Sequence, residues 1–119
     1  ATNADFGHAD LAGADLRRGE FSKAFFLGAN LTEARFEGAH LDGANLATAD
    51  FSGVKDWEFI SSIRCANIYG MIAPYEFKKW ALANGALEYD RYHWDEWLEA
   101  RDACLVQDVD EADSTEGIR

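Results

Sequence analysis

A large apolar residue recurs at every fifth position through the first half of the chain. Ten consecutive pentapeptides run from Ala4 to Gly53, and the third residue of each is Leu or Phe. The first residue is Ala in nine of them and Gly in the other, at Gly19. An α-helix repeats at about 3.6 residues and a strand at 2, so neither keeps this series on one face. The repeat therefore predicts a chain that turns after each short side, with one small and one large residue per five pointing inward.

Units such as ADLAG, ANLTE and ANLAT resemble the repeats of the pentapeptide-repeat protein family. The resemblance covers residues 4–53 and implies a mainly β fold, a right-handed quadrilateral β-helix with four pentapeptides in each coil. The four sides come from the resemblance, because the period alone does not fix their number. Neighbouring coils would pair at about 4.8 Å, and residues twenty apart would stack.

Stacking at twenty residues predicts inward columns of Leu and Phe and outward columns of polar residues. Outward, Asp15 should lie below Arg35, Arg17 below Glu37 and Glu20 below His40, while the other carboxylates should simply be hydrated. The expected core columns are Phe6, Phe26 and Leu46; Leu11, Leu31 and Phe51; Leu16 and Phe36; and Phe21 and Leu41.

The five-residue pattern slips at residues 54–60 and then resumes. The inward positions return at Ile63 and Ile68, two residues out of register, so we expect one side of the coil to bulge near Asp56 and Trp57. The β-helix should then have about three coils and occupy residues 1–70.

Residues 71–105 have helical rather than five-residue periodicity and predict a C-terminal α-helical cap. One helix should open at Pro74 and close before Gly85, and a second should have Asp90 as its N-cap. The apolar stripe of the second helix is Trp94, Trp97, Leu98, Cys104 and Leu105. Both helices should cover the open end of the last coil, the alternative being a free helix pair that binds a partner. Residues 106–119 predict an acidic flexible tail.

Charge and cysteine content limit the partners and the compartment. The net charge of −11 argues against direct nucleic-acid binding, and no apolar run approaches the roughly 20 residues of a membrane span. The spacing of Cys65 and Cys104 matches no disulfide framework or CxxC pair, so two reduced thiols are expected. The redox compartment stays open, and a cytoplasmic location is favoured.

Catalytic chemistry has no support in the sequence. His8, His40 and His93 lie far apart, and no HExxH, CxxC or phosphate-binding glycine motif is present. We therefore expect no catalytic, cofactor-binding or metal-binding residues, no cofactor and no enzymatic activity.

A non-catalytic structural or protein–protein interaction module is the favoured function, with an unidentified protein partner. The candidate interaction patch is Phe25, Leu27, Trp57 and Tyr69, although Phe25 and Leu27 could instead contact a folded-back helix. A homodimer through the N-terminal coil is a further hypothesis.

Two alternatives remain: a DNA-mimicking inhibitor of a type II topoisomerase, and an accessory domain of a larger protein. The predicted β-helix rises by about 16 Å, and DNA duplex of that length carries roughly nine negative charges. Residues 1–70 carry ten acidic and six basic residues, a net charge of −4, which makes the mimic the weaker reading.

Overall fold

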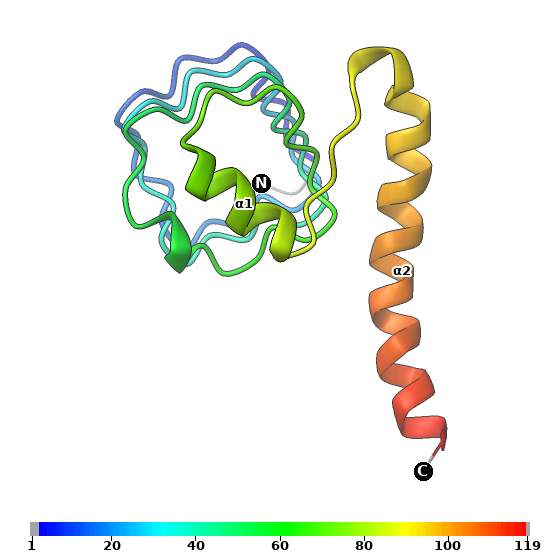
Figure 1. Cartoon of the computed structure of the whole chain (residues 1–119). Helices are drawn as coiled ribbons and strands as arrows, with labels where there is room; N and C mark the ends of the chain where they lie inside the picture. The colour runs from blue at the N-terminus through cyan, green and yellow to red at the C-terminus, as the bar shows by residue number, and fades with distance from the viewer. Residues whose placement is uncertain (1–2, 119) are drawn as a thin grey trace.

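Parallel β-bridges join residues twenty apart in the first half of the chain. The computed structural model describes residues 3–118, with side chains through residue 106. Its coils stack on one another around a filled centre (Figure 1). The bridges of the first coils pair Asp5 with Phe25, Asp10 with Asn30, Asp15 with Arg35, Glu20 with His40, Phe25 with Asn45 and Asn30 with Asp50. The expected twenty-residue register is therefore observed, and four pentapeptides make one coil.

Each corner of a coil is a β-turn that begins at the inward Leu or Phe. At the first corner the N–H of Ala9 donates to the carbonyl of Phe6 at 3.0 Å, and His8 at the third turn position has φ 58°. A positive φ at the third position but not the second is the geometry of a type II turn. The side between two corners is too short for a ladder. The bridges among residues 3–118 are consequently isolated, where a mainly β fold had predicted strands.

An Asp or Asn before the inward residue closes most corners with a second hydrogen bond. Its Oδ1 atom accepts from the backbone N–H two residues later, as in an Asx turn. These acceptors are Asp5, Asp10, Asp15, Asn30, Asn45, Asp50 and Asn67. Hydration alone was expected for the outward carboxylates, so the recurrent Ala-Asp/Asn-Leu/Phe triplet carries a structural signal that the sequence analysis missed.

The centre of the coils is filled by the small and large inward side chains. The rings of Phe36 and Phe51 lie 5.2 Å apart, between centroids, in adjacent columns. Three inward residues of the first coil, Phe6, Leu11 and Leu16, are only partly buried. The remaining column residues are buried: Phe21, Phe26, Leu31, Phe36, Leu41, Leu46, Phe51, Ile63 and Ile68.

A two-residue insertion shifts the register between the second and third coils of the stack. His40 pairs with Ser62, Asn45 with Asn67 and Asp50 with Ile72, all at a separation of 22. The extra residues form a bulge in which Asp56 has φ 56° and η1 (Trp57–Phe59) follows. The expected slip at residues 54–60 is therefore observed. The pairing of Ile72, and that of Asn67 with Leu87, extend the stack beyond the boundary expected at residue 70.

Helix α1 (Tyr75–Ala83) lies across the open end of the last coil (Figure 1). Pro74 precedes it as N-cap, as expected. Phe77 is fully buried, and its ring lies 4.7 Å from that of Phe51 in the core. Trp57, on the bulge, packs against both Phe77 and Trp80 of the helix. Helix α1 thus caps the stack, and Trp57 belongs to the cap.

Helix α2 (Trp94–Ile118) follows η2 (Arg91–His93) and lies beside the coils, not over their end (Figure 1). Asp90 is the N-cap of η2, and its side chain accepts from the N–H groups of Tyr92 and His93. The prediction that both helices cover the end is wrong for α2, because α1 already fills that end. The backbone of residues 106–118, expected as a flexible tail, continues α2, and residue 119 lies outside the described residues. No helix of the described chain is long and apolar enough to cross a bilayer.

Outward ion pairs form mostly along a coil instead of between coils. Arg17 pairs with Asp15 at 2.8 Å and Arg35 with Glu37 at 3.3 Å, where vertical pairs had been expected. The hydrogen bond from Arg17 holds the pKa of Asp15 below its usual range. Of the three vertical pairs expected, that of His40 with Glu20 is observed, at 3.6 Å. Arg17 and Arg35 thus each pair with the carboxylate two residues away on their own coil.

Replacing Phe36 by Ala should lower the free energy of unfolding by about 3 to 5 kcal/mol, because a cavity would replace a fully buried ring. Urea denaturation followed by circular dichroism measures the change. Phe59→Ala is the control: Phe59 is 64% exposed, so its loss should change stability by less than about 0.5 kcal/mol. Equal effects of the two substitutions would contradict the assigned core.

Replacing Thr48 by Asn should raise the free energy of unfolding by about 1 kcal/mol. Thr48 is β-branched yet has φ 58°, a conformation that Asn tolerates far better. The same denaturation experiment tests it. Ala12→Asn is the control. Ala12 is the second residue of its turn and has no positive φ, so this substitution should leave the free energy of unfolding nearly unchanged. A lower free energy of unfolding for Thr48→Asn would contradict the idea that the positive φ of Thr48 costs stability.

Candidate interaction surface

The four residues predicted as an interaction patch separate into two locations. Phe25, Leu27 and Tyr69 lie on the lateral wall of the coils that faces η2 and the start of α2. The ring of Phe25 stacks on Trp94 at 6.3 Å, so Phe25 contacts a folded-back helix, one of the two alternatives. Tyr69 is 44% exposed and Leu27 is half-buried. Trp57 lies elsewhere, under α1.

A groove of about 580 Å³ runs between this lateral wall and the segment that leads into α2. Its size falls within the range of ligand-binding clefts. The coils contribute His8, Leu27, Ala47, Thr48, Asn67 and Tyr69, and the opposite side consists of Tyr89, Asp90, Arg91, Tyr92 and Trp94. Four of these side chains are aromatic. His8 on the coil wall and Asp90 and Arg91 on the opposite wall add polar and charged groups to these flat apolar faces.

A second hollow of about 390 Å³ continues the groove toward the first coil. It shares His8, Leu27 and Trp94 with the larger one and adds Phe25 and the carboxylate of Asp5. The two hollows therefore form one elongated groove, which suits an extended ligand better than a compact one. We refer to both together as the lateral groove.

Asn67 positions the far wall of the lateral groove. Its Nδ2 donates to the carbonyl of Tyr89 at 2.9 Å, and its Oδ1 accepts from the N–H of Tyr89 at 3.0 Å. The side chain is 4% exposed, so both bonds are shielded from water. This two-point clamp fixes Tyr89 against the coils. The sequence analysis missed it, since Asn67 occupies an ordinary repeat position.

His93 and Asp90 form the polar end of the segment that leads into α2. The Nδ1 atom of His93 lies 2.6 Å from Oδ1 of Asp90, and Nε2 lies 3.8 Å from Glu96. The hydrogen bond with Asp90, followed by the charges of Asp90 and Glu96, raises the pKa of His93 above 6.5. The same hydrogen bond lowers the pKa of Asp90. The pair therefore strengthens the start of α2 while His93 is protonated.

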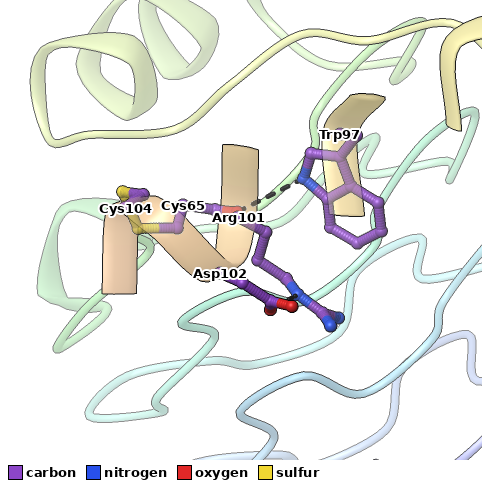
Figure 2. The surroundings of a disulfide bond; sticks show 5 residues. All are labelled: Cys65, Trp97, Arg101, Asp102 and Cys104. Atoms are coloured by element: carbon purple, nitrogen blue, oxygen red, sulfur yellow. Dashed lines mark hydrogen bonds and ion pairs between the residues drawn. A yellow bond between two sulfur atoms is a disulfide. The ribbon is translucent and has the colours of Figure 1, made fainter. Parts of the chain in front are cut away.

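Helix α2 is fixed to the coils by a disulfide and by a buried tryptophan (Figure 2). Cys65 and Cys104 are bonded, with their Cα atoms 6.0 Å apart, within the usual range. The expectation of two reduced thiols is thus wrong, because the sequence spacing of 39 gave no sign that α2 folds back onto the coils. Beside the bond, Trp97 is fully buried and its indole N–H donates to the carbonyl of Cys65 at 3.4 Å.

Small residues let α2 approach the coils closely. A Cβ atom at Gly43 would lie 3.2 Å from Cδ of Arg101 and 3.3 Å from Cδ1 of Leu105, and Gly43 has φ 68°. Asn45, two residues on, is fully buried, and its Nδ2 has no hydrogen-bond partner. Arg101 lies over the ring of Trp97 at 5.2 Å. The wall under α2 is therefore a narrow strip of small side chains next to the aromatic groove.

Metal binding finds no site in the described part of the chain, where no three His, Cys, Asp or Glu side chains gather as ligands. The lateral groove contains hydroxyl, imidazole, carboxylate and guanidinium groups, but Asp90 is engaged in capping η2 and Arg91 lies over the ring of Tyr92. The arrangement is suited to holding a ligand by aromatic contact and charge.

This chain is similar to a known protein family and to solved structures. A family model described as pentapeptide repeats matches residues 2–38 and 29–55, with eight copies. A pentapeptide repeat protein from the Arabidopsis thaliana thylakoid lumen, solved by crystallography, is 30% identical over 59% of this chain, with a TM-score of 0.37. The match spans half of that protein's chain. No curated protein matches.

Titration of His93 should give a pKa above 6.5, and Asp90→Asn should lower it. Because the folded-state pKa is raised, the stabilisation is complete below pH 6.5 and is lost as the pH rises through the raised value. NMR of the imidazole protons measures both proteins. The wild type in denaturing urea provides the unfolded reference, and identical folded and unfolded values would contradict the Asp90 contact.

Proposed function

The chain belongs to the pentapeptide repeat family through residues 2–55, and from this premise we propose that it is a non-catalytic protein-interaction module. We infer a right-handed quadrilateral β-helix that serves as a rigid support. The lateral groove would bind an extended, basic segment of a partner protein. One observation carries this proposal: an elongated aromatic groove on the side of a strongly acidic protein.

Shape favours an extended ligand. The groove runs along one wall of the stack, and its two hollows share Leu27 and Trp94. Grooves lined by aromatic side chains are used by proteins to bind extended peptide segments. Tyr92, which is 83% exposed, stands at the rim, where a bound segment would cover it.

Charge favours a basic ligand. The net charge of −11 attracts cationic segments over distances of about 8 Å at physiological salt. Within the protein, Arg91 lies over Tyr92 at 5.5 Å and Arg101 over Trp97 at 5.2 Å. The first contact supports the idea that the exposed ring of Tyr92 accepts a guanidinium group, as cation–π pairing predicts, whereas Trp97 is buried and lies outside the groove lining. Asp5 adds a carboxylate at one end of the groove.

The disulfide bears on where such a module would work. Disulfides persist in oxidising compartments and are rare in the cytosol. The Cys65–Cys104 bond therefore favours an oxidising location over the cytoplasmic one expected from the sequence, and we propose the former.

Binding can be tested with a fluorescein-labelled decapeptide in which Gly-Arg is repeated five times. Fluorescence anisotropy at 0.15 M salt should show saturable binding to the oxidised protein, and Tyr92→Ala should weaken it by about three- to tenfold through loss of an aromatic face. The Gly-Glu peptide of the same length should not bind.

Tyr75→Ala is the matched control, because Tyr75 is 70% exposed on α1, outside the residues that line the groove. Its affinity for the Gly-Arg peptide should equal that of the wild type. If Tyr92→Ala binds the Gly-Arg peptide as tightly as the wild type, overall charge alone explains the binding, and the groove is not the binding site.

A further inference from the structure

The two walls of the lateral groove are attached to the fold in different ways. Leu27, Thr48 and Tyr69 belong to the hydrogen-bonded coils, whereas Tyr92 and Trp94 belong to η2 and α2. The Asn67 clamp holds the chain only as far as Tyr89. Beyond that residue, the position of the outer wall depends on how α2 is held.

Helix α2 contacts the coils along one strip of its surface. The rest of its described part faces solvent, where the exposed residues are Asp95, Glu96, Glu99, Asp102, Ala103 and Val106. Trp97 is the one fully buried side chain in the described part of the helix. Beside it, Trp94 stacks on Phe25, and Arg101 and Leu105 lie against Gly43. The covalent bond from Cys104 to Cys65 lies at the far end of this contact strip.

Net charge opposes the contact between α2 and the rest of the protein. Residues 94–118 contain nine carboxylates and one arginine, a net charge of −8, and residues 1–93 contain thirteen carboxylates and nine basic residues, a net charge of −4. Like charges of this size repel one another, and the repulsion grows as salt is removed. The disulfide therefore holds together two parts that electrostatics separates.

We propose that the Cys65–Cys104 disulfide is a redox latch that keeps the lateral groove assembled. When it is reduced, α2 leaves the lateral wall by pivoting at Asp90, and the groove loses Tyr92 and Trp94. The inference about what the groove binds rests on the proposed function, but the release of α2 does not.

The reductant is a dithiol. Its thiolate attacks Sγ of Cys104, which is partly exposed while Cys65 is buried, and the Cys65 sulfur leaves as a thiolate that takes up a proton. The second thiol of the reductant then attacks the mixed disulfide and releases Cys104. Two electrons and two protons pass to the protein, and the dithiol becomes a cyclic disulfide.

Hydrogen exchange followed by mass spectrometry tests the release on the full chain. In the oxidised protein, amides of residues 97–106 should be protected. After reduction with dithiothreitol they should exchange at least about tenfold faster, more so at 20 mM than at 500 mM salt, since local opening controls their exchange. Residues 75–83 of α1 should keep their protection, because that helix caps the core without the disulfide.

Cys104→Ser separates the latch from other effects of the reductant. This variant should show the fast exchange of α2 without dithiothreitol and no further change with it. Persistent protection of α2 in both the reduced protein and Cys104→Ser would overturn the latch. Loss of protection in α1 as well would equally overturn it, because the bond would then support the whole fold.

Binding of the Gly-Arg decapeptide is measured on the same samples. If α2 is released while the oxidised protein never bound the peptide, the latch stands and the proposed function fails. If the peptide binds and α2 stays protected on reduction, the proposed function stands and the latch fails.

Discussion

Hydrogen bonding between backbones twenty residues apart is the constraint on which the rest of the structure depends. Each side of a coil satisfies its neighbour's amide and carbonyl groups, as where the N–H of Leu31 donates to the carbonyl of Asp50 at 2.9 Å. Such pairing requires every coil to keep the same perimeter. The Ala and Leu or Phe pattern fixes that perimeter, because each corner buries one small and one large side chain. A single inward polar residue would be left without a partner in a core only a few side chains wide.

The repeated part of the fold could be read from the sequence because its signal is local and redundant. Ten pentapeptides specify one geometry, and a two-residue slip at 54–60 could be seen as a break in an otherwise regular series. Pro74 and Asp90 were equally legible as helix starts, since N-terminal signals act within a few residues. Where the chain departs from repetition, the sequence analysis had only helical periodicity. That periodicity shows that α2 has an apolar stripe and leaves open which surface the stripe meets.

The lateral groove could be anticipated only in part for the same reason. Phe25 and Leu27 stood out as large apolar residues at outward positions, and both lie on the wall that η2 and α2 face. Three features depend on contacts between segments that are distant in the sequence: the disulfide, the Asn67 clamp and the packing of Trp57 against α1. Pairing across 39 residues is set by tertiary packing, which no spacing rule for cysteines encodes.

The bulge and the disulfide are linked through register. Cys65 pairs by its N–H with the carbonyl of Gly85, and it lies above Gly43 because the insertion makes the separation 22. At a separation of 20, Ile63 would stand above Gly43 at this corner, and the cysteine would fall two positions along the coil. Cys65 also has φ 66°, the corner conformation that Gly43 and Gly85 share. The corner therefore presents its sulfur to α2 beside Gly43, whose missing side chain leaves room for Arg101 and Leu105 of the helix. An irregularity of two residues in the repeat thus determines where α2 is attached, and with it the outer wall of the groove.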